Sequence, residues 1–177
     1  MDGDAELIRR VLAGEKACFQ ALVERHQRGV FRFVHNLVGD LQEAEDLAQE
    51  VFLAAFRNLD RFDARRARFS TWLFVIARNR CSNWLRGNTL ALKQLSDDGA
   101  DPGGAPNHRR LGQELDRAFA RLPLVQRTAF LLAQVEGLSH AEIAEIEGVR
   151  PGTVKSRVHR ARRRLQGLLQ HMREDVR

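Results

Sequence analysis

Apolar residues recur every three to four positions along most of the chain, and almost no stretch alternates with the period of two that strands show. This pattern predicts an all-α protein. A first helix is predicted over residues 4–13, before Gly14. A second helix carries an apolar stripe over residues 19–37 and is predicted to end at Gly39, since glycine readily adopts the left-handed conformation that closes a helix.

Two further helices are predicted in the first half of the chain. The third opens at Asp40, because Asp40 and Glu43 have the spacing of a capping box. Its apolar face consists of Ala44, Leu47, Ala48, Val51, Phe52, Ala55 and Phe56. The fourth is predicted to begin after Ser70, a favourable N-cap residue, and to run to Gly87 with Trp72 on its apolar side.

The composition changes abruptly after this helix. Residues 87–112 contain five of the 13 glycines, two of the four prolines and no aromatic residue, whereas ten of the twelve Phe and Trp side chains come earlier. A stretch of this composition is typical of a flexible linker. We therefore expect two small helical domains, residues 1–86 and residues 113–177, joined by a flexible linker over residues 87–112.

The second domain has the spacing of a helix-turn-helix. Two helices broken around Pro123 lead to Ser139 and Glu142, whose S-x-x-E spacing predicts a capping box at the start of a short helix. Gly148 then permits a tight turn, and Pro151 suits the first position of a new helix. A short helix, a glycine turn and a second helix are typical of helix-turn-helix DNA-binding domains.

The last helix has one apolar face and one basic face. At 100° per residue, one narrow face carries Val154, Val158, Ala161 and Leu165. Residues 150–164 include seven Lys or Arg and no acidic residue, whereas solvated surface helices usually mix both signs. A helix lying on a membrane needs a broader apolar face, so DNA is the partner indicated. The candidate DNA contacts are Lys155, Ser156, Arg157, His159, Arg160 and Arg163.

Composition and charge exclude other classes of function. The formal net charge of +6 favours polyanionic partners. No apolar run approaches the roughly 20 residues that span a bilayer, and the amino-terminal sequence lacks the basic-then-apolar order of a signal peptide, so we expect a cytoplasmic protein without membrane insertion. The cysteines and histidines lack metal-binding spacing, and no nucleophile–base pair is evident, so we expect no cofactor and no enzymatic activity.

Several segments resemble conserved regions of one family. The segments Ala44–Phe52, Phe69–Leu73 and Ile76–Asn79 resemble region 2 of the sigma-70 family. The segments Gly137–Ala144 and Gly152–Arg157 resemble its region 4. The resemblance covers nearly the whole chain and is to the extracytoplasmic-function (Group 4) sigma factors. It implies an alternative sigma factor that binds core RNA polymerase, through its β′ clamp helices and β flap, and directs promoter-specific transcription initiation, restrained by an anti-sigma factor.

An acidic segment stands out in this basic chain. Residues 40–50 hold five acidic residues and no basic one. The preference of carboxylates for a helix amino terminus explains Asp40 and Glu43. It does not explain Asp46 and Glu50, which share one helix face, with Gln49 beside them. The resemblance implies that this face docks on the β′ clamp helices, through Asp46, Gln49 and Glu50.

A second basic segment follows. Residues 57–86 hold eight arginines against two aspartates, interleaved with Phe62, Phe69, Trp72 and Trp84, a composition suited to phosphates and unstacked bases. The resemblance implies that the loop before the fourth helix, and the exposed face of that helix, recognise and melt the minus-10 promoter element by capturing an extruded base. The matching positions are Arg65, Arg66, Arg68, Ser70, Arg78, Asn79, Asn83 and Arg86.

Two alternatives remain open at this point. One is a helix-turn-helix transcriptional regulator with an amino-terminal sensory or dimerisation domain, and the second basic segment argues against it. The other is a recombinase-like enzyme with a DNA-binding tail. That enzyme needs a catalytic Ser or Tyr, but the chain has no tyrosine and no β/α core to hold a serine.

Overall fold

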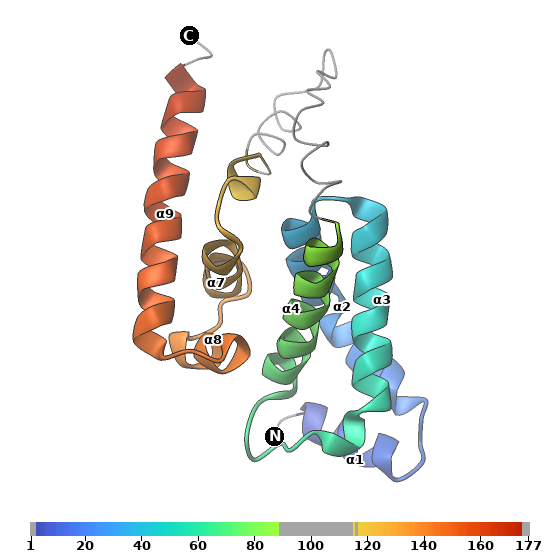
Figure 1. The fold of residues 1–177 in the computed structure, drawn as a ribbon. Coiled ribbons are helices and arrows are strands. Elements are labelled where there is room, and N and C mark those ends of the chain that lie inside the picture. The colour runs from blue at the N-terminus through green and yellow to red at the C-terminus, as the bar shows by residue number, and fades with distance from the viewer. Residues whose placement is uncertain (1–2, 89–114, 116, 175–177) are drawn as a thin grey trace.

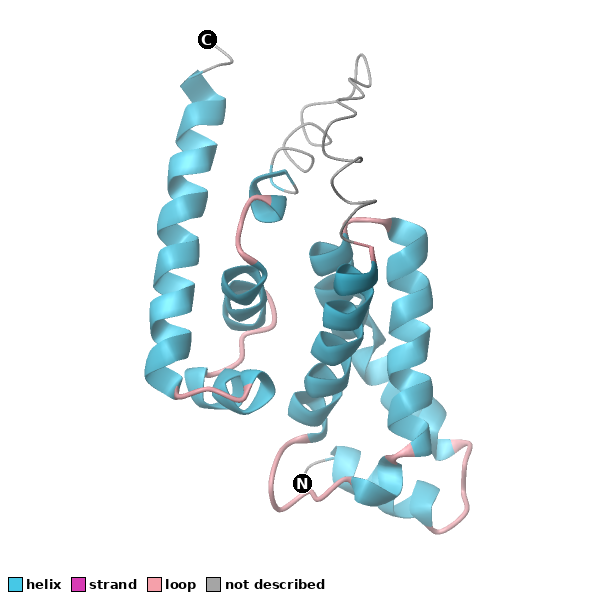
Figure 2. Ribbon diagram, in the orientation of Figure 1, coloured by secondary structure: helices cyan, strands magenta, loops and turns pink. Residues whose placement is uncertain are grey.

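The computed structural model describes residues 3–88, 115 and 117–174 (Figures 1 and 2). Its elements in chain order are α1 (Gly3–Leu12), α2 (Cys18–Val38), α3 (Leu41–Arg57), the short 3-10 helix η1 (Leu59–Arg61), α4 (Phe69–Gly87), α7 (Leu124–Gln134), α8 (His140–Glu147) and α9 (Pro151–Glu174). Every element of the described residues is helical, which confirms the predicted all-α fold. Residues 89–112 of the predicted linker lie outside the described residues.

The first half is a bundle of α2, α3 and α4, with α1 and η1 lying across its lower end in Figure 1. The predicted apolar stripes form its core, in which Leu22, Phe33, Val51 and Leu73 are fully buried. The short α1 is fixed to α2 by its buried carboxylate Asp4, which pairs with Arg25 and His26. These two partners offset the cost of burying the Asp4 carboxylate, so the pairing and the apolar packing together hold α1 on the bundle.

The predicted end of α2, start of α3 and end of α4 at Gly87 are confirmed, but the predicted start of α4 is not. Gly39 closes α2 with a φ of 84°, and Asp40 caps α3 by accepting a hydrogen bond from the Glu43 backbone nitrogen at 2.9 Å. The prediction that Ser70 caps the fourth helix is wrong, because α4 begins at Phe69. Phe69 is buried against the ring of Phe62, so aromatic packing sets the start of this helix.

The second half contains the helix-turn-helix as predicted. The capping box of α8 is complete, since Ser139 Oγ accepts from the Glu142 nitrogen and the Glu142 carboxylate accepts from the Ser139 nitrogen at 2.9 Å. Gly148 makes the turn with a φ of 65°, and Pro151 opens α9. The predicted apolar face of α9 is buried, comprising Val154, Val158, Ala161 and Leu165.

The two halves contact one another. Helix α8 packs on α4, and α7 packs on α2, so the buried side chains of both halves form one continuous apolar cluster. Figure 1 shows α8 beside the lower part of α4, with α9 on the outer side of the molecule. This arrangement leaves the outer faces of α9 and α3 on opposite sides.

Candidate functional site

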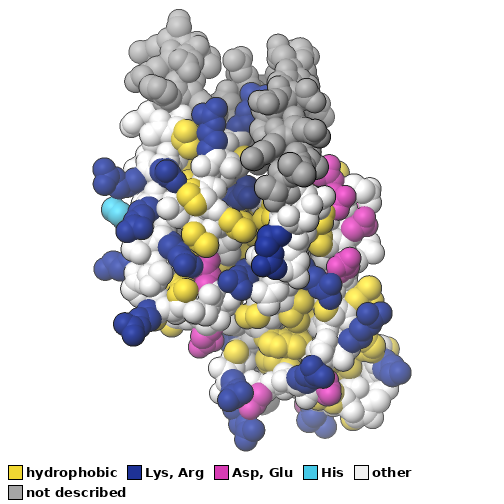
Figure 3. All heavy atoms as spheres, in the orientation of Figure 1, with side chains coloured by type: hydrophobic (Ala, Val, Ile, Leu, Met, Phe, Trp, Pro, Cys, Tyr) yellow, Lys and Arg dark blue, Asp and Glu magenta, His cyan; other side chains and the backbone are white. Residues whose placement is uncertain are grey.

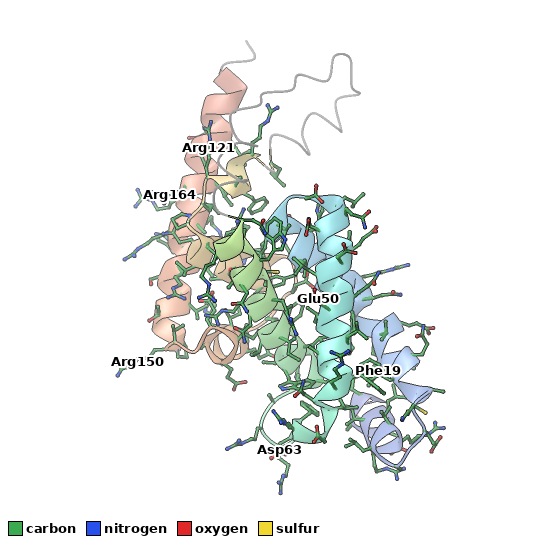
Figure 4. All side chains as sticks on the ribbon, turned by 45° about the vertical axis from the view of Figure 1, so that its right-hand side comes forward. Phe19, Glu50, Asp63, Arg121, Arg150 and Arg164 are labelled. Atoms are coloured by element: carbon green, nitrogen blue, oxygen red, sulfur yellow. The ribbon has the colours of Figure 1, made fainter. Side chains whose placement is uncertain are left out.

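The outer face of α9 presents most of the predicted DNA contacts. Lys155, His159, Arg160 and Arg163 are all exposed there. Figure 3 shows Lys and Arg side chains gathered along this edge of the molecule. Figure 4 labels Arg150 near the start of α9 and Arg164 farther along the same helix. An exposed row of cations on the second helix of a helix-turn-helix suits the phosphates and base edges of a major groove.

Two predicted residues of α9 are engaged inside the protein. The Ser156 hydroxyl donates to the Thr153 carbonyl at 2.8 Å. The Arg157 guanidinium forms an ion pair with Glu147 of α8, whose side chain is only 3% exposed. Burial raises the pKa of Glu147, and the hydrogen bond from Arg157 counteracts that rise. Arg157 therefore joins the two helices of the helix-turn-helix, a role that its spacing in the sequence did not reveal.

A groove between α7 and α9 extends the basic surface. It has a volume of about 490 Å³ and is lined by Gln126, Arg160, Arg163 and Arg164. Three guanidinium groups around one open groove suit a phosphate backbone, since arginine offers several donors in a fixed plane. Arg160 and Arg163 were predicted from the sequence as DNA contacts, but the groove was not.

The loop before α4 carries three exposed arginines, as predicted. Arg65 pairs with Asp63 at 3.1 Å and lowers the pKa of that carboxyl, mainly through the side-chain hydrogen bond. Arg66 is exposed, and Arg68 reaches Glu142 of α8 at 3.5 Å. Ser70 is half-buried in the first turn of α4. The loop thus offers cations to solvent, one of which contacts the other half of the protein.

The predicted polar face of α4 is present. Asn79, Asn83 and Arg86 are exposed and lie four and three positions apart, so they share one face of the helix. Arg86 donates a hydrogen bond to the Asn83 side chain. Arg78 is half-buried and donates to the Asn79 side chain at 2.8 Å. These four residues form a polar surface along the later turns of α4.

The acidic face of α3 lies on the other side of the molecule. Asp46 and Gln49 are exposed, whereas Glu50 is exposed but paired with Arg80 of α4 at 3.3 Å. Figure 4 labels Glu50 on this helix, and Figure 3 shows acidic side chains along the same edge. The three predicted docking residues are therefore together on one helix, and only Glu50 has an ion-pair partner among the described residues.

An apolar part of the same face was not predicted. Leu53 is 54% exposed, and Phe56, which the sequence placed in the core, is exposed as well. Asp46, Gln49, Leu53 and Phe56 are spaced by three, four and three residues, so they follow one stripe along α3. Leu53 follows the core residue Val51 by two positions, which places it on roughly the opposite side of the helix. This offset is the sequence signal that could have revealed the exposed stripe.

This stripe borders an apolar groove between α2 and α3. The groove has a volume of about 650 Å³ and is lined by Lys16, Ala17, Phe19, Gln20, Val23, Gln49, Phe52, Leu53 and Phe56. Exposed apolar side chains next to a groove, on the same helix face as the exposed polar residues Asp46 and Gln49, are typical of a protein-binding surface. The face thus combines acidic and apolar contacts.

Comparisons with known proteins agree with this layout. The family model for Sigma-70 region 2 matches residues 22–90, and the model for Sigma-70, region 4 matches residues 112–165. The chain is 32% identical over 181 residues to the ECF RNA polymerase sigma factor SigW of Bacillus subtilis, with 93% of this chain and 96% of SigW covered. The first half is therefore a region 2 domain, not the sensory or dimerisation domain of the alternative.

Solved structures of sigma factors have the same fold. CnrH in complex with the cytosolic domain of CnrY superposes with a TM-score of 0.78 at 25% identity, covering 96% of this chain and 99% of CnrH. The sigma factor RpoE of Bartonella quintana, in complex with the anti-sigma factor NepR, gives a TM-score of 0.70 at 28% identity, covering 86% of this chain and 96% of RpoE. In the part of the chain that the structure describes, no helix is long and apolar enough to cross a bilayer. The chain belongs to the sigma-70 family, in its extracytoplasmic-function group.

Proposed function

We propose that this alternative sigma factor binds core RNA polymerase through α3 and divides promoter recognition between its two basic surfaces. The family assignment supplies the function, which is to direct transcription initiation at particular promoters. The observation that carries the division of labour is the segregation of charge. One acidic and apolar face lies on α3, and the basic surfaces lie on α4 with its preceding loop and on α9.

The α3 face suits a protein partner. Asp46 and Gln49 supply polar contacts, and Leu53 and Phe56 supply apolar area beside a groove. Buried apolar area with a polar rim is the usual composition of such interfaces. We assign this face to the β′ clamp helices of the polymerase, with Asp46, Gln49 and Glu50 as contacts and the β flap as the partner of the second half.

The two basic surfaces suit two promoter elements. Arg65, Arg66 and Arg68 lie in a loop that leads into α4, which suits phosphates flanking a separated strand. On α4, the exposed amides of Asn79 and Asn83 offer donors and acceptors to base edges, so we assign this surface to the minus-10 element. We assign the minus-35 element to α9.

The division among the α9 residues follows their exposure. Lys155, His159, Arg160 and Arg163 are free to reach DNA, and Arg160 suits bidentate pairing with guanine. Ser156 can reach DNA only by exchanging its bond to the backbone, and Arg157 supports the fold of the motif.

The remaining parts of the proposal concern partners and chemistry. The sigma factor acts in the cytoplasm beside the polymerase and forms no phosphodiester bond itself, since that chemistry belongs to the polymerase. The relative RpoE is solved with an anti-sigma factor, and we propose that an anti-sigma factor also restrains this chain.

Transcription in vitro tests the function directly. The full chain is added to purified core polymerase with a genomic promoter library, and the transcript starts return the promoter sequence. We expect a defined class of promoters with a shared minus-35 and minus-10 sequence. Transcription that does not depend on the added chain would contradict the proposal.

Docking is tested by replacing Asp46, Gln49 and Glu50 with alanine. Core-polymerase affinity should fall while the circular dichroism stays unchanged, because all three side chains are exposed. The matched control is Glu145→Ala, an exposed carboxylate on α8. Affinity equal to that of the control would remove the docking assignment.

Strand opening is tested separately. Neutralising Arg65, Arg66 and Arg68 should impair melting of the minus-10 element more than formation of the closed complex, since these cations hold the separated strand. Permanganate footprinting reports melting, and a gel-shift titration reports closed-complex binding. Normal melting in this variant would contradict the minus-10 assignment.

A further inference from the structure

A buried carboxylate on α1 is linked to the start of α4 through one ring. Asp4 is buried, and its carboxylate accepts a hydrogen bond from His26 Nε2 of α2 at 2.9 Å. The neighbouring Arg25 donates to the other oxygen of the same carboxylate. The His26 ring packs edge-on against Phe69, with 5.4 Å between the ring centroids. His26 therefore stands between α1 and the first residue of α4.

Phe69 belongs to an aromatic cluster that brackets the arginine loop. Its ring packs edge-on against Phe62 with 5.6 Å between centroids. The Trp72 ring contacts both, at 5.4 Å from Phe62 and 5.8 Å from Phe69. Phe62 precedes the loop and Phe69 follows it, so one cluster fixes both ends of residues 63–68.

The loop between these two anchors is a compact turn. The Asp63 carboxylate accepts a hydrogen bond from the Arg65 backbone nitrogen at 3.0 Å. The Asp63 carbonyl accepts one from the Arg66 backbone nitrogen, also at 3.0 Å. A turn closed on its own first residue keeps its internal shape. The directions in which Arg65 and Arg66 point therefore depend on how the two anchors are held.

Stability alone is a weak reason for a buried carboxylate in this place. Ile8 and Val11 already pack α1 on the bundle through apolar contacts. Taking an ion pair out of water is costly, so such pairs often contribute little to stability. Unlike an apolar contact, however, the bond from His26 to Asp4 has a direction and fixes the rotation of the ring. The contact of an aromatic edge with Phe69 depends on that rotation.

We propose that Asp4 is a positioning residue for promoter opening, because it fixes the His26 ring against Phe69 and thereby sets the place of the arginine loop. The inference rests on the proposed minus-10 function of that loop. Asp4 contacts no DNA and acts through His26. A hydrogen bond to a charged group corresponds to a factor of about ten or more in an equilibrium, which gives the expected size of the effect.

The test compares Asp4→Ala with Glu6→Ala in the full chain. Glu6 is an exposed carboxylate of the same helix, ion-paired with Arg9, so this control removes a similar charge away from His26. In Asp4→Ala, hydrogen–deuterium exchange over residues 63–72 should be about tenfold faster than in the control. Promoter opening by the holoenzyme, followed by permanganate footprinting, should fall by about the same factor. Binding to minus-35 duplex DNA should match the control, because that surface lies on α9.

His26→Phe checks the route by which Asp4 acts. This variant keeps a ring beside Phe69 and the pair of Asp4 with Arg25, but it removes the Nε2 that Asp4 orients. It should impair opening as Asp4→Ala does, even if Asp4→Ala also loosens α1. The double variant should open the promoter no more slowly than the slower single variant, because both changes break one chain of contacts. Additive losses would overturn the route through His26.

Each contrary result has its own meaning. Exchange in Asp4→Ala equal to that of Glu6→Ala would remove the link to the loop. Equal losses of opening and of minus-35 binding would make Asp4 a residue of the fold only. Normal opening in Asp4→Ala, while the variant neutralised at Arg65, Arg66 and Arg68 opens poorly, would overturn the positioning role and leave the minus-10 assignment standing. Normal opening in both variants would overturn the minus-10 assignment, and the positioning role with it.

Discussion

Arg157→Ala should destabilise the protein because it leaves a buried carboxylate without its ion-pair partner. The partner, Glu147, has a side chain that is 3% exposed, while that of Arg157 is 22% exposed. Removing one member of a buried ion pair costs about 3–5 kcal/mol of stability. Because Arg157 is partly exposed, we expect a cost at the lower end of this range, about 3 kcal/mol. For a chain of this size, 1 kcal/mol shifts the midpoint of thermal unfolding by about 2–4 °C, so we expect a fall of about 6–12 °C.

The loss should depend on pH with a definite sign. Burial raises the pKa of Glu147 in the folded protein above its unfolded value, and Arg157 limits that rise. A raised carboxyl pKa stabilises the fold below the unfolded pKa, and this contribution is lost as the pH rises through the folded pKa. Without Arg157 the folded pKa rises further, so the destabilisation should be large at about pH 8 and smaller at about pH 5.

Thermal and urea unfolding followed by circular dichroism measure this effect. Arg160→Ala is the matched control, since it removes the same side chain from an exposed position of the same helix and should leave stability unchanged. Combining Arg157→Ala with Glu147→Gln should recover most of the loss, because the buried carboxylate is gone. An equal loss at both pH values, or no recovery in the double variant, would refute the assignment of Arg157 to the fold.

Three other changes give distinct outcomes. Arg160→Ala should weaken binding to minus-35 DNA by about 1–3 kcal/mol and relax selectivity at one or two base positions. Arg162→Ala should weaken binding to all DNA sequences alike and lower the salt dependence of binding by about one counterion. Titrations on matched and mismatched duplexes distinguish the two outcomes. Gly148→Ala should cost about 1 kcal/mol in urea unfolding, because its φ of 65° strains any other residue. Leu53→Asp should weaken polymerase binding in a pull-down without lowering stability, since Leu53 is exposed.

The sequence predicted what depends on local spacing. The buried face of α9 and the capping box of α8 are confirmed because periodicity and caps act within a few residues of each other. The predicted start of α4 was wrong because the burial of Phe69 depends on Phe62, which lies outside the helix. Phe56 continues the period of the α3 core, and its ring packs edge-on against Phe19 of α2 with 5.0 Å between centroids. Its other side borders the open groove between α2 and α3, so the residue remains 36% exposed.

The sequence could not predict which charges meet. Arg32 and Glu136 are 104 positions apart, and neither belongs to a motif. Their pairing depends on how α2 and α7 pack, which no local pattern encodes. The candidate residues were therefore found by charge and resemblance, while their partners required the structure.

We expect the burial of the partner carboxylate to decide whether a paired arginine of this sigma factor can exchange its partner for DNA. Arg157 faces a carboxylate that is almost wholly shielded, so exchanging it for a phosphate would leave a buried charge behind. Arg68 is 76% exposed and faces Glu142 at 3.5 Å, and an exposed pair contributes only about 0–1 kcal/mol. A promoter phosphate can therefore replace Glu142 beside Arg68 at little cost, but it cannot replace Glu147 beside Arg157. We therefore expect the two arginines to differ in role, with Arg157 stabilising the fold of the helix-turn-helix and Arg68 making a contact that DNA can take over.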